Sequence, residues 1–208
     1  MIKREAGRNN SRIGGAGVII LIHKRVVPIF TLLVKYLNRN GRVSDEVLSL
    51  HLVRPTLSAV LQLTESLKHD PALKYVENIN KLRPNNGVKD LLSGKRLTND
   101  QVENHMLLVS VETVTNRFRK KYPNPNITLQ AGSVEKRETV MGAGIRELLE
   151  EARIHVQSDI VHSIPMKLLG GGLFMYPCHI DSNTEVKILE HSIQLLRRKC
   201  KWPRGYKA

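Results

Sequence analysis

The chain has 208 residues, of which 41% are hydrophobic, and it carries a net charge of +14 at pH 7. This size and hydrophobic content suit one folded domain with room for an insertion, and they exclude a disordered protein. The excess of cations favours a polyanionic partner, nucleic acid above all. Two cysteines without a CxxC pair argue against a disulfide scaffold and indicate a reducing compartment.

The N-terminus is basic and is followed by an apolar run. Residues 1–12 are polar and basic, and we expect them to form a basic arm. The next run is short, is followed at once by His23-Lys24-Arg25 and lacks a small-x-small cleavage site, so it does not fit a signal peptide. No stretch approaches the roughly 20 apolar residues of a membrane span. We expect an intracellular protein without membrane segments.

Residues 13–37 contain two apolar runs, GAGVIILIH and VVPIFTLLVKY. Both are rich in Val and Ile, which favours strands, and charged residues separate them. Pro28 near the start of the second run suits a strand end or edge. The pattern predicts two strands joined by a tight connection.

Between residues 38 and 122 the spacing of apolar residues changes from a pattern typical of strands to one typical of helices. Apolar residues recur at helical spacing in four segments, and prolines mark turns between them. The segments lie near 44–53, 55–69, 71–82 and 98–118. We predict a helical insertion, and its role remains open: it could be a lid that selects the substrate, a packing appendage or a homodimer surface.

The end of this insertion, Arg117-Phe118-Arg119-Lys120-Lys121-Tyr122, alternates cations with aromatic side chains. Such a composition suits RNA, because cations bind phosphates and aromatic rings stack on bases. Cations also stabilise the C-terminal end of a helix. Arg117, Arg119, Lys120 and Lys121 are therefore candidate RNA contacts, with helix capping as the alternative.

Residues 126–131 read as a strand that leads to Gly132, and a helix follows from about Thr139. Successive helical residues rotate by about 100°, so one face is apolar and the opposite face carries Glu147, Glu150 and Glu151. Like charges at this spacing repel each other. A cation is therefore expected to bind the acidic face.

The spacing of fixed residues in this stretch resembles the box of the Nudix hydrolases, GX5EX7REUXEEXGU, in which U is aliphatic. The matching residues are Gly132, Glu138, Arg146, Glu147, Leu148, Glu150, Glu151 and Ile154. An ordinary amphipathic helix would not require Gly132 and Glu138 at fixed distances upstream. The one departure is Arg153, where the family has a glycine with positive φ. We therefore expect the exit turn of the helix to be built differently here.

The resemblance implies an α+β fold, specifically an α/β/α Nudix sandwich with a mixed sheet, formed by residues 13–37 and 123–199. It also implies metal-dependent hydrolysis within the pyrophosphate of a nucleoside diphosphate linked to another group. In the family, glutamates matching Glu147, Glu150, Glu151 and Glu138 bind Mg²⁺ or Mn²⁺. The arginine matching Arg146 orients these carboxylates, and the loop backbone at Gly132 approaches the site.

The resemblance leaves the general base open between a box glutamate and an acid outside the box. Glu147 is the first candidate, and Asp181 and Glu185 are the alternatives. The eight histidines form no zinc pattern and are expected to be structural or on the surface.

The C-terminal part predicts strands at 159–164 and 166–180, with a bend or bulge at Gly170-Gly171-Gly172. A closing helix is predicted over 184–199, followed by a basic tail over 200–208. The cations of this end are further candidate RNA contacts: Arg197, Arg198, Lys199 and Lys201.

The overall layout resembles Nudix proteins of large DNA viruses, namely the poxvirus-type mRNA decapping enzymes and the baculovirus ADP-ribose pyrophosphatases. Capped RNA is our first substrate hypothesis, because a charge of +14 suits an RNA backbone. Aromatic side chains can also sandwich the cationic m⁷G ring. The candidates are Tyr36, Phe118, Tyr122, Phe174, Tyr176 and Trp202.

The alternative substrate is ADP-ribose or another nucleoside diphosphate derivative. Many ADP-ribose enzymes carry a proline about 16 residues after the box, and this chain has Gly170 there, which weakens the alternative. A catalytically dead RNA-binding protein is disfavoured, because each expected metal carboxylate is present.

Overall fold

The structure is a computed structural model of the chain, and it describes residues 14–39, 47–94, 96–113, 124–168 and 172–181. Its centre is one mixed sheet with the strand order β3-β5-β4-β1-β8-β7, in which β2 also pairs with β4 and β6 with β1. The strands are β1 (Gly15–His23), β2 (Val47–Val53), β3 (Arg83–Pro84), β4 (His105–Thr113), β5 (Pro125–Thr128), β6 (Ala131–Gly132), β7 (Met166–Leu168) and β8 (Leu173–Ile180).

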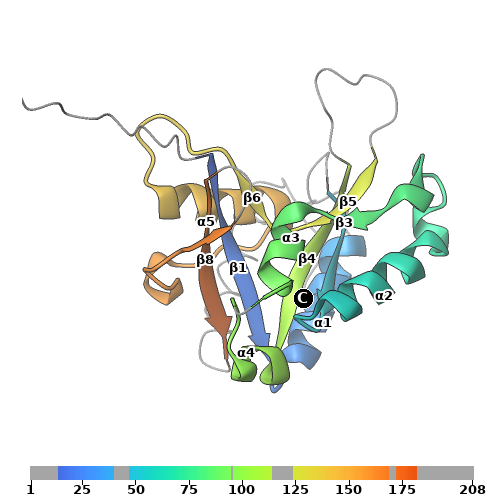
Figure 1. The fold of residues 1–208 in the computed structure, drawn as a ribbon, viewed down its shortest axis with the longest axis horizontal. Coiled ribbons are helices and arrows are strands. Elements are labelled where there is room, and N and C mark those ends of the chain that lie inside the picture. The colour runs from blue at the N-terminus through green and yellow to red at the C-terminus, as the bar shows by residue number, and fades with distance from the viewer. Residues whose placement is uncertain (1–13, 40–46, 95, 114–123, 169–171, 182–208) are drawn as a thin grey trace, which may run out of the picture.

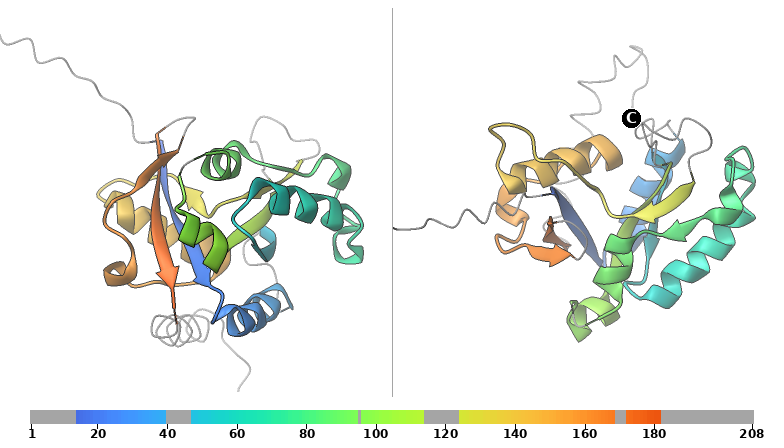
Figure 2. Two further views of the ribbon diagram at one scale, coloured as in Figure 1. Left: turned by 60° about the horizontal axis from the view of Figure 1, so that its bottom comes forward. Right: turned by 45° about the horizontal axis from the view of Figure 1, so that its top comes forward.

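Helices cover both faces of this sheet (Figures 1 and 2). They are α1 (Val27–Arg39), α2 (Leu57–Lys68), α3 (Asn86–Leu92), α4 (Asn99–Asn104) and α5 (Val140–Ala152), with 3₁₀ turns at Pro71–Leu73, Ile79–Lys81 and Ser158–Ile160. One hydrophobic cluster joins the sheet to α1 and α5, and the other joins it to α2 and α3. This arrangement confirms the expected α+β fold with a mixed sheet.

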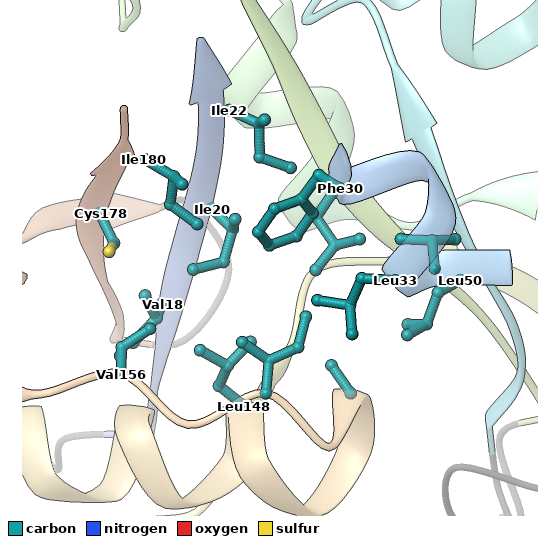
Figure 3. Close-up of a cluster of buried hydrophobic side chains, with 14 of the residues drawn as sticks. Val18, Ile20, Ile22, Phe30, Leu33, Leu50, Leu148, Val156, Cys178 and Ile180 are labelled. Atoms are coloured by element: carbon teal, nitrogen blue, oxygen red, sulfur yellow. The ribbon is translucent and has the colours of Figure 1, made fainter. Parts of the chain in front are cut away.

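Strand β1 is the centre of both clusters, because alternate residues of a strand point to opposite faces. Figure 3 shows Val18, Ile20 and Ile22 on the side of Phe30 of α1 and Leu148 of α5. Ile19 and Leu21 belong to the cluster on the other face. A strand that is buried on both faces reads as a continuous apolar run, and the prediction of a strand here is confirmed.

The second predicted strand is wrong, because VVPIFTLLVKY forms the helix α1. Its buried residues are Phe30, Leu33, Val34 and Leu37, which fall on one face of a helix. Pro28 lies in the first turn, where a proline breaks no helical hydrogen bond. The sequence prediction followed the β-branched residues, which favour a strand, although the spacing of the apolar residues fits a helix.

Two helices predicted within residues 38–122 are also wrong. Residues 47–53 form β2, and 98–118 begins with the short helix α4 and continues into β4. Strand β4 lies between β1 and β5, and its residues from Leu107 to Val111 are fully buried. Burial on both faces again produced an apolar run that imitates a helical pattern. The region contributes β2, β3 and β4 to the common sheet and is not an all-helical insertion.

The remaining predictions in this region have mixed outcomes. Helix α2 confirms the helix expected at 55–69, with Thr56 as its N-cap. The helix expected at 71–82 is wrong, because only two 3₁₀ turns form there. Asn78 in the middle of this stretch has a φ of 60°, a left-handed conformation that an α-helix does not contain.

After α5, the strand predicted at 159–164 is wrong. A 3₁₀ turn occupies Ser158–Ile160, and Val161 makes one isolated bridge to Cys178. Strands β7 and β8 form an antiparallel pair, and Gly172 between them has a φ of 75°. The change of direction at the triple glycine thus agrees with the predicted bend.

Several predictions fall on residues that the structure does not describe. They are the arm at 1–12, the basic stretch at 117–122, the helix at 184–199 and the tail at 200–208. Within the described ranges, no helix is long and apolar enough to cross a membrane.

Candidate active site

The candidate site is built from β6, the loop at 133–139 and helix α5. Strand β6 pairs with the first residues of β1, at Ala16 and Gly17. Helix α5 begins after Thr139, whose hydroxyl accepts a hydrogen bond from the Gly142 N–H at 3.0 Å. The predicted start of this helix is therefore confirmed, and the cap satisfies one of its free N–H groups.

Helix α5 lies directly on β1 because two glycines face each other. A Cβ on Gly144 would lie 2.9 Å from the backbone carbonyl of Gly17. Real Cβ atoms do not approach a backbone so closely. A glycine inside a helix costs about 1 kcal/mol relative to alanine, and the close contact with β1 explains why it is present here.

The guanidinium group of Arg146 is the centre of a carboxylate cluster. Its Nε donates to Glu138 Oε1 at 3.1 Å, and its Nη1 donates to Glu147 Oε1 at 2.7 Å and to Glu150 Oε2 at 3.0 Å. Its Nη2 donates to the Ser133 carbonyl at 2.8 Å and to Glu138 Oε2 at 3.2 Å. Arg146 therefore joins the loop and two turns of α5, which is the orienting position that the box resemblance implies.

Glu151 and Gly132 complete this arrangement. Glu151 Oε2 accepts a hydrogen bond from the Ala131 N–H at 3.0 Å. A Cβ on Gly132 would lie 2.2 Å from the carboxyl carbon of Glu147. The absence of a side chain at Gly132 is thus what makes room for the Glu147 carboxylate.

The surroundings shift the pKa values of the cluster in opposite directions. The hydrogen bond from Arg146 lowers the pKa of Glu138. Burial raises the pKa of Glu147, although Arg146 opposes this effect. The same carboxylates, with Glu138 first, raise the pKa of Arg146, which stays charged.

The four glutamates fit Mg²⁺ or Mn²⁺ in donor type and in charge. All their ligand atoms are carboxylate oxygens, which such hard cations prefer. Four carboxylates and one guanidinium leave an excess of negative charge for a divalent cation to neutralise. Among the described residues no three acid, histidine or cysteine side chains converge as a metal cage. Arg146 and the Ala131 N–H hold the four carboxylates instead.

The exit of α5 corrects the expectation about Arg153. Arg153 has φ 55° and ψ 23°, which is the left-handed conformation, and its N–H donates to the Leu149 carbonyl at 3.0 Å. The turn is therefore built as a glycine would build it, with an arginine in its place. Left-handed backbone costs a non-glycine residue about 1–2 kcal/mol.

The structure separates Asp181 from the box. Strand β8 is parallel to β1, and its last residue Ile180 pairs with Ile22, at the opposite end of β1 from Gly15. Eight strand residues span about 25 Å. Asp181 is therefore wrong as a general base for this cluster, and Glu185 lies outside the described residues.

The other sequence candidates are scattered or outside the described ranges. Tyr176 is buried, Phe174 packs against the core and Tyr36 is partly exposed on α1. Tyr75, which the sequence did not single out, is 82% exposed. The candidates outside the described residues are Phe118, Tyr122 and Trp202, with the cations Arg117, Arg119, Lys120, Lys121, Arg197, Arg198, Lys199 and Lys201.

Sequence reasoning missed the backbone partners of the cluster. The Ala131 N–H and the Ser133 carbonyl hold Glu151 and Arg146. Backbone groups have no residue signature, so only their position next to Gly132 could have indicated them.

A group of histidines occupies the opposite end of the sheet. His23, His105 and His179 end or begin neighbouring strands, and successive rings contact edge to face with centroids 5.2 Å apart. The Arg25 N–H donates to His23 Nδ1 at 3.2 Å. Gln101 Oε1 accepts from the Thr98 N–H, so its amide nitrogen faces His179 Nε2 at 3.0 Å and donates to it. Both rings thus accept a hydrogen bond through one ring nitrogen.

No family model, curated protein or solved structure matches this chain.

Proposed function

We propose that the protein is a metal-dependent pyrophosphohydrolase of the Nudix type. The observation that carries this proposal is the cluster around Arg146, in which one guanidinium contacts three of the four box glutamates. The close fit of Glu147 against Gly132 supports it further. Each fixed residue of the box thus has a specific contact that its chemical type explains.

The chain's own residues would bind and orient the reacting groups. Glu138, Glu147, Glu150 and Glu151 would hold Mg²⁺ or Mn²⁺, which neutralises the diphosphate and lowers the pKa of a water. Glu147 is the box glutamate that we assign to take the proton from the attacking water. The water oxygen bonds to one phosphorus, and the bond from that phosphorus to the bridging oxygen breaks. One water is consumed, and two phosphate groups result.

Capped RNA is the substrate we propose, cleaved to m⁷GDP and 5′-monophosphate RNA. The net charge of +14 supports it, because a long polyanion gains more from such a surface than a small dinucleotide does. ADP-ribose is the competing substrate, since the box chemistry serves it equally well.

A side-by-side assay with Mg²⁺ or Mn²⁺ tests this proposal. Cap-labelled RNA and ADP-ribose are supplied at equal concentration, and we expect release of m⁷GDP at the higher kcat/KM. Much faster turnover of ADP-ribose would overturn the choice of RNA and leave the reaction class intact.

A pair of isosteric variants tests the reaction class. Glu150→Gln and Glu151→Gln remove a negative charge each while keeping shape, so we expect turnover of either substrate to fall below detection with an unchanged melting temperature. Glu103→Gln, in α4 and outside the cluster, is the matched control. Full activity in both box variants would remove the metal assignment.

A further inference from the structure

A small pocket shares a wall with the carboxylate cluster. Its volume is about 260 Å³, which is below the range of sites that hold a whole drug-sized molecule. Gly132 and Ser133 line it. Gly132 also contacts the Glu147 carboxylate, and the Ser133 carbonyl accepts from Arg146. Gly132 and Ser133 thus lie between a group bound in this pocket and one bound at the cluster.

The lining of the pocket is uncharged and contains no aromatic ring. Four of its residues are glycines, namely Gly14, Gly15, Gly87 and Gly132. The polar side chains are those of Asn85, Thr128 and Ser133, and the other three lining residues are aliphatic. A phosphate group binds most strongly beside cationic side chains, and a nucleobase gains most from an aromatic surface. Neither is present among the lining residues.

The polar side chains of the pocket are held in position. Asn85 Nδ2 donates to Thr128 Oγ1 at 2.7 Å, and Asn85 Oδ1 accepts from the Val88 N–H at 2.9 Å. Thr128 in turn donates to the Leu129 carbonyl at 3.0 Å. An amide that is fixed in this way has a second N–H hydrogen to offer a hydroxyl group. The lining thus suits a small, neutral ligand with hydroxyl groups.

We propose that this pocket binds the ribose next to the diphosphate, and so selects ribonucleotides over deoxyribonucleotides. In a nucleoside diphosphate the ribose is bonded directly to the phosphate group, so a diphosphate at the glutamates places its ribose beside Gly132 and Ser133. This inference rests on the proposed function for the position of the diphosphate, and the recognition of the sugar comes from the pocket itself.

Substitutions at Gly87 test the pocket by filling it. A Cβ on Gly87 would lie 3.4 Å from Asn85 Oδ1 and 3.8 Å from Leu173 Cδ2, which are ordinary contacts with two lining residues. Gly87→Ala therefore fits, whereas the longer side chain of Gly87→Leu enters the pocket. Both replacements favour the helix, so neither should impair folding. Gly94→Leu is the matched control, because a Cβ there meets nothing within 4 Å.

The measurement is equilibrium binding of GDP and of 2′-deoxy-GDP in the presence of Mg²⁺, with melting temperatures as the check on folding. We expect the wild type to bind GDP about three- to tenfold more tightly, the range that one hydrogen bond gives. Gly87→Leu should weaken GDP binding at least tenfold and remove the preference, while Gly87→Ala and Gly94→Leu keep both.

Equal binding of GDP and 2′-deoxy-GDP by the wild type, or unchanged GDP binding by Gly87→Leu, would overturn the proposal. These outcomes are separate from a failure of the proposed function. If the protein hydrolyses no diphosphate but binds GDP with the stated preference, ribose binding in the pocket is supported and the proposed hydrolysis is contradicted. If the protein hydrolyses diphosphates without any preference for ribose, the proposed hydrolysis is supported and ribose binding in the pocket is contradicted.

Discussion

The two ends of strand β1 carry opposite kinds of polar groups. Near Gly15 the cluster around Arg146 consists of charged side chains that neutralise one another in part. At His23 three histidine rings contact one another edge to face, and two of them accept hydrogen bonds. The first end has an excess of negative charge, while the second consists of contacting imidazole rings with one carboxylate, that of Asp100, beside them. One apolar strand thus separates a site suited to chemistry from an end suited to stability.

The largest expected effect comes from filling the space at Gly132. In Gly132→Ala the new methyl group would overlap the Glu147 carboxylate, since its Cβ would lie 2.2 Å from Cδ. Because misplacement by about 1 Å can cost a factor of 100 in rate, we expect kcat to fall at least about 100-fold. Steady-state hydrolysis measures it. Gly94→Ala serves as control, and wild-type activity in Gly132→Ala would contradict this account of the cluster.

A second substitution, Gly144→Ala, tests the packing of α5 on β1 without changing a residue of the carboxylate cluster. Gly144→Ala forces α5 away from Gly17, and overpacking of this kind costs about 1–3 kcal/mol. Chemical denaturation should show this loss in the free energy of unfolding. The expected displacement of α5 should also lower activity. A variant as stable as the wild type would mean that the helix and β1 can separate without cost.

The contribution of the histidines to the free energy of unfolding should change with pH in a range separate from that of the glutamates. Desolvation, with contributions from His105 and His162, lowers the pKa of His179, whereas Asp100 opposes the shift. His51, half-buried on β2, has a lowered pKa for the same first reason. The folded protein therefore binds fewer protons than the unfolded chain just below pH 6.5. Stability should be complete above about pH 6.5 and fall as the pH drops toward the folded pKa values.

Urea unfolding between pH 7.5 and 5 measures this slope. The effect of His179 alone should be only a few tenths of a kcal/mol, because its ring is partly exposed to solvent. His179→Gln should give a shallower slope, with the contribution of His51 remaining. At the other end, the lowered pKa of Glu138 contributes stability that is lost only below about pH 4.5. A slope that is identical in His179→Gln would assign the acid sensitivity to another group.

One substitution is expected to raise stability, at the exit of the helix that carries the carboxylates. Arg153→Gly removes the cost of a left-handed arginine but makes the unfolded chain more flexible. The net gain in the free energy of unfolding should be about 0.5–1 kcal/mol. Thermal denaturation measures it, and hydrolysis should be unchanged. A loss of stability would show that the Arg153 side chain contributes more than its backbone costs.

The sequence determined the local features of the site. Helical periodicity after Thr139 predicted the helix and its acidic face, because periodicity is a property of the chain alone. The approach of Gly132 and Glu138 to this face was an implication of the family resemblance. The apolar run of β1 was equally clear. The predictions for α1, β2 and β4 were wrong. In α1 the β-branched residues masked the helical period. In β2 every third residue is buried, as on a helix, and in β4 burial on both faces removed the alternation typical of a strand.

Tertiary structure decided what no periodicity can encode. The contact of Gly144 with Gly17 and that of Gly132 with Glu147 depend on where separate elements meet. The pairing of β1 with β4 and β8 likewise collected three histidines from distant parts of the chain and moved Asp181 away from the glutamates. Strand neighbours are chosen by burial of whole faces, and so these distances follow from the packed sheet rather than from residue spacing.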